Sequence, residues 1–230
     1  MSSKTFPTLE FELGLFAAGA RLVIGVDEVG RGALFGPVSV GVAVLRADKH
    51  TDGWPAELAD SKLISQRQRE NLVEPLSSWV EAWAVGSATN VEIDELGITA
   101  CLALAARRAI GSLPEALRSE VAVAPQSATI ILDGSHNWLA GSVGQVRVVT
   151  KTKADRDCVS VAAASVLAKV TRDSEVTELA LANPELKKFG IAGNKGYSSA
   201  AHIDALQTHG PSGYHRQTWL TKILGEDALF

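Results

Sequence analysis

The chain has 230 residues, of which 46% are hydrophobic and 21% charged, and its formal net charge is −4. This length suits one large domain, or one domain with an appendage, and it allows a sizeable core; the composition is ordinary for a globular protein. The negative balance excludes a basic field over the whole molecule, so a nucleic-acid partner would need a local basic patch. Residues 150–230 hold ten Lys and Arg against nine Asp and Glu, whereas the remainder hold 12 against 17. Such a patch is therefore expected in the last third.

The two cysteines, Cys101 and Cys158, lie far apart in the sequence. The small number and wide spacing of the cysteines argue against a disulfide framework and a zinc site, and they fit a reducing compartment. The N-terminus lacks the basic-then-apolar pattern of a signal peptide, and no apolar run approaches the ~18–20 residues of a membrane span. We therefore expect a cytoplasmic protein with no membrane partner.

In chain order, the first half predicts strands that follow one another closely. The predicted elements are a helix over 10–20, strands over 22–28 and 38–45, a helix over 66–77 capped by Ser65, and a strand over 79–88. The strand at 38–45 is nearly all apolar and β-branched, so it should be buried on both faces. The close order of these strands favours an antiparallel meander.

The second half predicts strands that alternate with helices. The predicted elements are helices over 91–95 and 98–110, an irregular stretch over 111–126, strands over 128–132 and 145–150, a long helix over 158–181, a loop at 194–197, and helices over 199–208 and 217–224. This order indicates a mixed α/β domain with a helical C-terminal part.

The first predicted strand runs into two adjacent carboxylates, Asp27 and Glu28, followed by a Gly-Arg-Gly loop at 30–32. Successive residues of a regular strand point to opposite faces, so both acids can serve one site only if the strand bends or ends there. Acidic side chains at the end of a buried strand are costly unless they are paired, hydrogen-bonded or bound to a cation. The segment is a candidate metal site, with a solvated acidic turn as the alternative.

Two further acids follow predicted strands, Asp133 after the fourth strand and Asp155 after the fifth. In open α/β sheets, ligands bind outside the carboxyl ends of strands, where such acids can converge. Mg²⁺ binds through a few carboxylates plus substrate phosphates, and two such ions can stabilise both oxygens of an in-line phosphoryl displacement. Spacing alone leaves alternatives open. Asp133 also suits an ordinary turn, Asp155 suits a charge at a helix N-terminus, and Asp157 competes with Asp155 for either role.

Several motifs together resemble the bacterial ribonuclease HII family, a type 2 ribonuclease H family. They are Gly-Val-Asp-Glu-Val-Gly-Arg-Gly at 25–32, Asp-Ser-Lys at 60–62, Ile-Asp-Glu-Leu at 93–96, Leu-Asp-Gly at 132–134, Lys-Thr-Lys-Ala-Asp at 151–155, the helix sequence at 163–173 and Lys-Gly-Tyr at 195–197. These matches follow the family order and span nearly the whole chain. The chain departs from the family pattern at Ala154, at Asn194 and in the segment 63–65. None of these positions is one of the acidic residues of the motifs.

The resemblance implies a ribonuclease-H-like fold with a mixed five-stranded sheet flanked by helices. It also implies an N-terminal helical extension over 1–20, a catalytic domain over 21–185, and a helical substrate-binding part over 186–230 that packs on the same domain. The implied activity is an endoribonuclease that hydrolyses the RNA strand of RNA–DNA hybrids and incises duplex DNA 5′ of single ribonucleotides. We expect a monomer.

The resemblance further implies roles for individual residues. The four catalytic, metal-binding acids would be Asp27, Glu28, Asp133 and Asp155, with two Mg²⁺ or Mn²⁺ ions in the substrate complex. Backbone groups of Gly30, Arg31 and Gly32 would sense the 2′-hydroxyl, since glycine lacks the Cβ bulk that would hold a sugar away. The ring of Tyr197 would stack at the RNA–DNA junction. Phosphate contacts are expected of Lys62, Lys153 and Lys195, which flank the motifs.

Other functions fit the sequence less well. A different nuclease or a transposase-type enzyme on the same fold would not explain the Gly-Arg-Gly and Lys-Gly-Tyr motifs. An inactive nucleic-acid-binding member of the fold would not need intact acids. A dinucleotide-binding loop is excluded because the glycines at 30, 32 and 36 break the required spacing. Among the histidines, His202 and His209 can share a helix face, and a surface role is expected for both.

Overall fold

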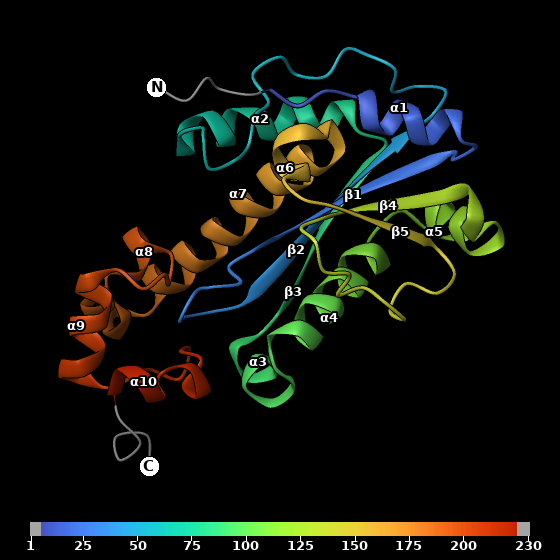
Figure 1. The fold of residues 1–230 in the computed structure, drawn as a ribbon. Coiled ribbons are helices and arrows are strands. Elements are labelled where there is room, and N and C mark those ends of the chain that lie inside the picture. Colours follow the sequence, from blue (N-terminus) through green and yellow to red (C-terminus); the bar gives the residue numbers. More distant parts are fainter. Residues whose placement is uncertain (1–5, 225–230) are drawn as a thin grey trace.

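Figure 1 shows a computed structural model of the protein, which describes residues 6–224. Its centre is a five-stranded sheet with the strand order β3-β2-β1-β4-β5. The strands are β1 (Leu22–Val29), β2 (Val38–Arg46), β3 (Ala82–Ala88), β4 (Ala128–Asp133) and β5 (Arg147–Lys151). β2 is antiparallel to β1 and β3, whereas β1, β4 and β5 run parallel. The predicted meander and the mixed five-stranded sheet are therefore confirmed, and β1, β4 and β5 end at one edge of the sheet.

Helices cover both faces of this sheet (Figure 1). They are α1 (Glu10–Ala17), α2 (Gln66–Trp79), α3 (Asn90–Leu96), α4 (Ile98–Gly111), α5 (Glu115–Val123), α6 (Ala154–Asp157), α7 (Val159–Ala182), α8 (Ile191–Asn194), α9 (Ala200–His209) and α10 (Thr221–Leu224). Short 3₁₀ segments lie at Pro125–Ser127, Pro184–Phe189 and Gln217–Trp219. None of the helices in this described part has the length and apolar character that crossing a membrane would require.

The long helix α7 lies unusually close to the centre of the sheet. Gly25 of β1 and Gly41 of β2 face it, and a Cβ atom at Gly25 would stand 2.2 Å from the backbone of Ser160. A larger residue would push the helix away from the strands. The close approach brings the buried first half of α7 beside the end of β1. The opposite face of β1 packs through Leu22, Ile24 and Val26 against α4 and its neighbours.

Three expectations from the sequence were wrong at the level of elements, the first being the single helix over 217–224, which is a 3₁₀ segment followed by α10. The stretch over 111–126 is not irregular, because α5 forms there with Pro114 as its N-cap and Leu117 buried against the sheet. The predicted third strand began too early, since Trp79 ends α2 and β3 begins only at Ala82. Proline is tolerated at a helix start, so Pro114 marks a beginning rather than a break. The predicted Ser65 cap is confirmed, and its side chain accepts from the N–H of Gln68.

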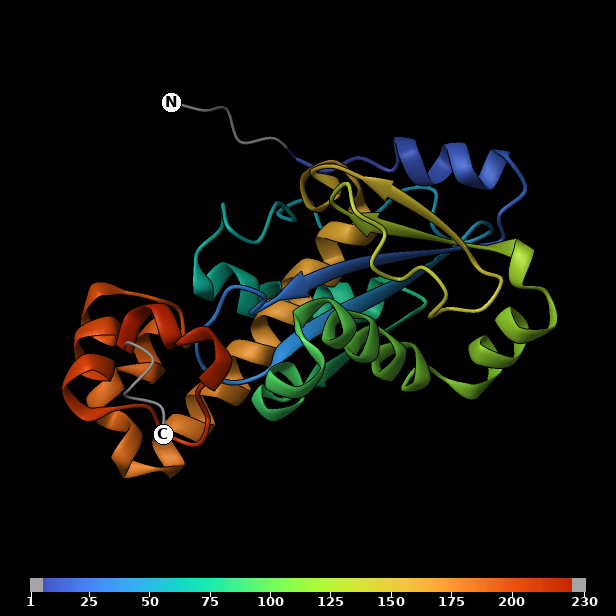
Figure 2. The same cartoon turned by 60° about the horizontal axis from the view of Figure 1, so that its bottom comes forward.

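The C-terminal helices form a separate cluster at one end of the molecule. Figures 1 and 2 show α7 running beyond the sheet and carrying α8, α9 and α10 at its far end. This cluster also holds the loop that follows β1, because Gly36 N–H donates to the Tyr214 carbonyl and Arg216 N–H donates to the Leu34 carbonyl, each at 2.9 Å. The boundaries predicted at 20 and 185 stay a prediction, but the cluster is joined by hydrogen bonds to the loop that leaves the sheet at the end of β1.

Candidate active site

Four carboxylates gather where the pairing between β1 and β4 stops. The last paired residues are Val26 and Leu132, whereas β1 continues beside β2 to Val29. The side chains that follow, Asp27, Glu28 and Asp133, border the resulting gap, and Asp155 joins them from the first turn of α6. The sequence required the strand to bend or end at Asp27. β1 does not end there. Its pairing with β4 stops at Val26 instead, and this lets the adjacent residues Asp27 and Glu28 serve one site.

Asp27 lies at the electrostatic centre of the group. It is only 6% exposed. Burial and the charges of Glu28, Asp133 and Asp155 raise its pKa to about 8, against a smaller lowering by the Ser165 hydroxyl. Burial also raises the pKa values of Glu28 and Asp133. Carboxylates that repel one another in a buried site favour bound protons or cations.

The partners of these carboxylates show what a cation would replace. Lys62 Nζ lies 2.9 Å from Asp155 Oδ2, on a side chain that is 73% exposed. Glu28 accepts from Arg31 Nη1 at 3.3 Å through Oε1, but its buried Oε2 has no hydrogen-bond partner in the described structure. As the side chains stand, no three Asp, Glu, His or Cys residues of the described chain are arranged to hold an ion. Hard oxygen donors, an unpartnered buried oxygen and a displaceable ammonium group nevertheless suit a hard divalent cation.

Asp155 and Asp157, the two candidates for the fourth acid, have different neighbours. Asp157 pairs with Lys151 Nζ at 3.1 Å and with Arg156 Nε at 2.8 Å, and these contacts lower its pKa, with the Arg156 hydrogen bond as the largest cause. Asp155 is 6% exposed and its charge acts on both Asp27 and Asp133. The carboxylate group therefore contains Asp155, while Asp157 belongs to a surface ion-pair cluster.

The Gly-Arg-Gly loop borders the same cavity as three of the carboxylates, Asp27, Glu28 and Asp133. This cavity of about 400 Å³ is lined by Asp27, Glu28, Val29, Gly30, Arg31, Gly32, Ser61, Lys62, Asp133, Ser165, Lys169 and Tyr197. Gly30 has φ +75°, and a Cβ atom there would lie 2.0 Å from Arg172 Nε. At Gly32, by contrast, a Cβ atom would meet nothing within 4 Å. The first glycine, Gly30, is required by the packing of the protein, whereas the second, Gly32, leaves open space beside the cavity.

Tyr197 reaches the same loop from the C-terminal part. Its hydroxyl accepts a hydrogen bond of 3.2 Å from Gly30 N–H. The Lys169 ammonium and the Arg172 guanidinium lie 5.1 and 5.6 Å from its ring centre. The sequence suggested a role for the ring alone, and the structure adds a role for the hydroxyl in holding Gly30.

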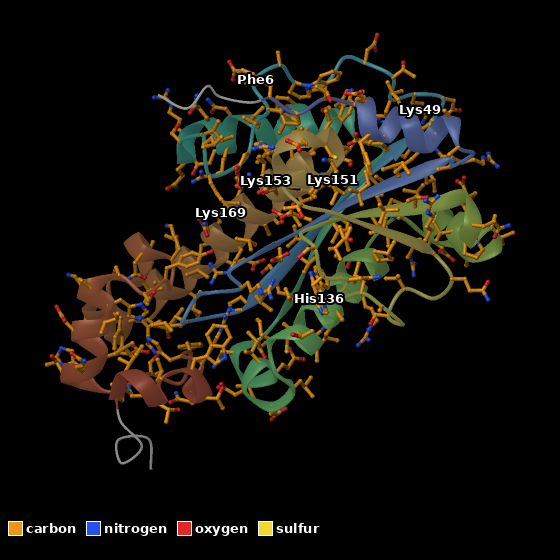
Figure 3. The ribbon with its side chains drawn as sticks, in the orientation of Figure 1. Phe6, Lys49, His136, Lys151, Lys153 and Lys169 are labelled. Carbon is orange, nitrogen blue, oxygen red and sulfur yellow. The ribbon has the colours of Figure 1, made fainter. Side chains whose placement is uncertain are left out.

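The three predicted phosphate-binding lysines have different surroundings. Lys62 pairs with Asp155 inside the site, and Lys153 is exposed at the N-terminal end of α6. Figure 3 shows Lys153 there and Lys169 farther along α7. Lys195 donates to Thr177 Oγ1 and to the Ala192 carbonyl, both at 2.6 Å. Its ammonium is thus engaged within the C-terminal part. Phosphate contact by these lysines stays a prediction.

Two site contacts lie on α7 and were missed by the sequence reasoning. Ser165 Oγ lies 2.9 Å from Ser61 Oγ, which ties the Asp-Ser-Lys segment to α7 beside Asp27. Lys169 follows one helical turn later and lines the cavity. The helix sequence at 163–173 was noted only as a family match. Its i, i+4 spacing places both side chains on one face, which was the available signal.

The buried polar residues of the C-terminal part were also missed. His202 was expected at the surface, and this was wrong. It is fully buried, with Nδ1 2.9 Å from the Tyr197 carbonyl and Nε2 3.0 Å from His215 Nε2. The buried face of α9 also includes Ala205 and Leu206, so the i, i+3, i+4 pattern could have revealed it. Arg172 and Arg216 are likewise fully buried.

Comparisons with known proteins agree with this geometry. The sequence profile of the family described as Ribonuclease HII matches residues 24–222. Ribonuclease HII of Streptomyces griseus is 46% identical over 214 residues, which cover 93% of this chain and 84% of that protein. Ribonuclease H2 of Pyrococcus horikoshii has a TM-score of 0.66 at 29% identity, covering 88% of this chain and 97% of that chain. The Mn²⁺ complex of Bst-RNase HIII shares the fold, with a TM-score of 0.60 at 24% identity over 92% of this chain and 65% of that chain. This chain belongs to the ribonuclease HII family.

Proposed function

We propose that this protein is a metal-dependent endoribonuclease that hydrolyses the RNA strand of RNA–DNA hybrids and incises duplex DNA 5′ of single embedded ribonucleotides. Family membership supports the hybrid-cleaving activity. The observation that carries the finer proposal is the shared cavity, in which Asp27 and Glu28 adjoin the loop at Gly30–Gly32. A site built this way couples recognition of the sugar to cleavage of the adjacent phosphate.

The carboxylates Asp27, Glu28, Asp133 and Asp155 would hold two divalent ions, Mg²⁺ or Mn²⁺. When bound, such ions stabilise the attacking and leaving oxygens of an in-line phosphoryl displacement. Asp27, from the central strand, would contribute to both positions, since the charges of the other three acids all act on it. Glu28 and Asp133 would serve one position and Asp155 the other. Lys62 would release Asp155 and become free to approach a phosphate.

The loop at Gly30–Gly32 would recognise the ribose. RNA differs from DNA by a 2′-hydroxyl that both donates and accepts hydrogen bonds. The open space beside Gly32 allows a sugar to approach the backbone, and the Tyr197 ring lies on the same cavity wall. We expect the protein to act as a monomer.

A cleavage assay with mapped products tests this function. The substrate is a DNA duplex with one ribonucleotide, and it is incubated with Mg²⁺, with Mn²⁺ or with chelator. We expect incision on the 5′ side of the ribonucleotide, leaving a 3′-hydroxyl and a 5′-phosphate, because the site activates water rather than the 2′-hydroxyl. A 2′,3′-cyclic phosphate product would contradict this mechanism. Binding without cleavage under both metals would indicate an inactive member of the fold.

A further inference from the structure

Arg216 is a fully buried arginine whose side chain reaches the loop after β1. Its Nη2 donates to the Gly30 carbonyl at 2.7 Å, its Nη1 to the Arg31 carbonyl at 2.9 Å, and its Nε to the Gly36 carbonyl at 3.2 Å. No ion pair is formed by Arg216 among the described residues, and its guanidinium lies 4.8 Å from the Trp219 ring centre. Burying an arginine on carbonyl groups alone is costly, so a purely space-filling role does not explain it.

The positions of these carbonyls fix where the next N–H groups point. Every peptide bond in the described chain is trans, so the C=O of one residue and the N–H of the next point in opposite directions. With the Gly30 and Arg31 carbonyls directed at Arg216, the N–H groups of Arg31 and Gly32 point away from it. Neither N–H has a hydrogen-bond partner in the described structure, and both residues line the cavity.

We propose that Arg216 is a positioning residue for sugar recognition, which holds two carbonyls so that the N–H groups of Arg31 and Gly32 are presented to the ribonucleotide. This inference rests on the proposed function. The guanidinium fork suits the task because its planar donors fix two neighbouring carbonyls at once, which a lysine ammonium cannot do in the same geometry.

The backbone around Arg216 strengthens the connection. Its own N–H donates to the Leu34 carbonyl, and Phe35 forms a β-bridge with His215. His215 in turn meets His202, whose other ring nitrogen lies at the Tyr197 carbonyl. Arg216 therefore belongs to one packed unit that reaches both Gly30 and Tyr197, and it controls the direction of the loop amides.

The test is the ratio of binding affinities for two duplexes that differ only in one 2′-hydroxyl. Affinities for a duplex with one ribonucleotide and for the all-DNA duplex are measured in an Asp155→Asn background, which keeps the substrate uncut. Arg216→Lys should lower this ratio about tenfold, the effect of losing roughly one hydrogen bond to the sugar. The matched control is Arg46→Lys, because Arg46 also makes three hydrogen bonds, to Glu81 and Glu120, at the far end of the sheet.

The outcomes separate positioning from simple stability. A lower melting temperature in both variants, with a reduced ratio only in Arg216→Lys, supports the proposal. An unchanged ratio in folded Arg216→Lys overturns it. If Arg216→Lys does not fold, Trp219→Leu keeps the arginine but removes the ring beneath it, and a two- to threefold lower ratio is expected. An unchanged ratio in that variant also overturns the proposal.

The wild-type protein distinguishes failure of this inference from failure of the proposed function. If the wild type cuts the single-ribonucleotide duplex and prefers it to DNA, the proposed function stands whatever Arg216→Lys shows. If the wild type shows neither cleavage nor preference, the proposed function and the role of Arg216 fall together.

Discussion

The carboxylates are placed by the ends of strands and the start of a helix, whereas the loop at Gly30–Gly32 is held by side chains from distant parts of the chain. Asp133 is the last residue of β4 and Asp155 lies in the first turn of α6. The loop, by contrast, is fixed by Tyr197 and Arg216, which are 167 and 186 residues away from Gly30. The first group depends on local structure and the second on the docking of the C-terminal part. Changes in the first should abolish the reaction, and changes in the second should alter substrate choice.

The largest effect is expected from the carboxylates. Asp27→Asn and Asp155→Asn should each lower kcat by on the order of 1000-fold on a single-ribonucleotide duplex, because each loses a charged ligand that stabilises the transition state. Both variants should remain folded in thermal melting. Asp157→Asn is the matched control and should stay within a few-fold of wild type, since Asp157 pairs with Lys151 and Arg156. Loss of activity in Asp157→Asn alone would move the fourth acid to that position.

The carboxylates should also make the metal-free protein sensitive to pH. Folding raises the pKa of Asp27 from 3.8 to about 8, so the folded state holds a proton that the unfolded state releases. This contribution to stability is fully present below about pH 4 and is lost as the pH rises through 8. In chelator, the melting temperature of the wild type should therefore fall more between pH 5 and 8 than that of Asp27→Asn.

Added Mg²⁺ should remove most of this pH dependence in the wild type. A bound cation offsets the repulsion between the carboxylates, which a proton on Asp27 offsets in the metal-free protein. The same addition should have little effect on Asp27→Asn. Parallel melting curves for the two proteins across this pH range would contradict the assignment of Asp27 as the centre of the group.

The two glycines of the loop at Gly30–Gly32 differ in the space that surrounds them. Gly30→Ala places a Cβ against Arg172 at φ +75°, so it should lower the free energy of unfolding by more than about 2 kcal/mol. Gly32→Ala meets no protein atom within 4 Å, so it should melt like the wild type. If a sugar approaches the backbone there, as proposed, the added methyl group would block it, and kcat/KM should fall by roughly tenfold or more. Equal stability losses in the two variants would show that Gly32 is structural.

The convergence of the carboxylates could be predicted from the sequence for a physical reason. Asp27, Glu28 and Asp133 follow apolar runs, and such runs form strands whose ends converge at one edge of a sheet. The convergence of Asp27 and Glu28 required one further fact, that the pairing of β4 with β1 stops at Leu132 while β1 continues beside β2. That difference in strand length depends on the whole sheet, so the local sequence does not contain it.

The sequence predicted much less about the side chains that hold the loop at Gly30–Gly32. Arg216 lies between His215 and Gln217, and a polar stretch of this kind normally indicates exposed chain. Its burial arises from carbonyls that belong to the segment after β1, and no local pattern reports such a partner. Arg172 was more accessible to prediction, because it stands four residues from both Ala168 and Val176 on the buried face of α7. The family motif identified Tyr197, but not the hydrogen bond from Gly30.

Tyr197 allows the most selective test of the contrast between the carboxylates and the loop at Gly30–Gly32, and the expected effect is the smallest. If its ring stacks on a sugar at the RNA–DNA junction, Tyr197→Ala should slow cleavage at a single ribonucleotide about tenfold more than cleavage within continuous RNA. Stacking on an aromatic side chain is worth roughly 1–3 kcal/mol per base, and a sugar contact should lie near the low end. The measurement is the ratio of the two cleavage rates, relative to wild type.

Tyr197→Phe separates the ring from the hydroxyl. This variant keeps the ring but leaves Gly30 N–H without its 3.2 Å hydrogen bond, so the loop loses one of the contacts that hold it. A hydrogen bond of this kind contributes about 0.5–1.5 kcal/mol, which predicts a roughly threefold slower cleavage of both substrates. The ratio of the two rates should stay near the wild-type value because the stacking surface is intact. If Tyr197→Ala also left the ratio unchanged while lowering stability, Tyr197 would only support the loop, and junction sensing would rest on Gly30, Arg31 and Gly32.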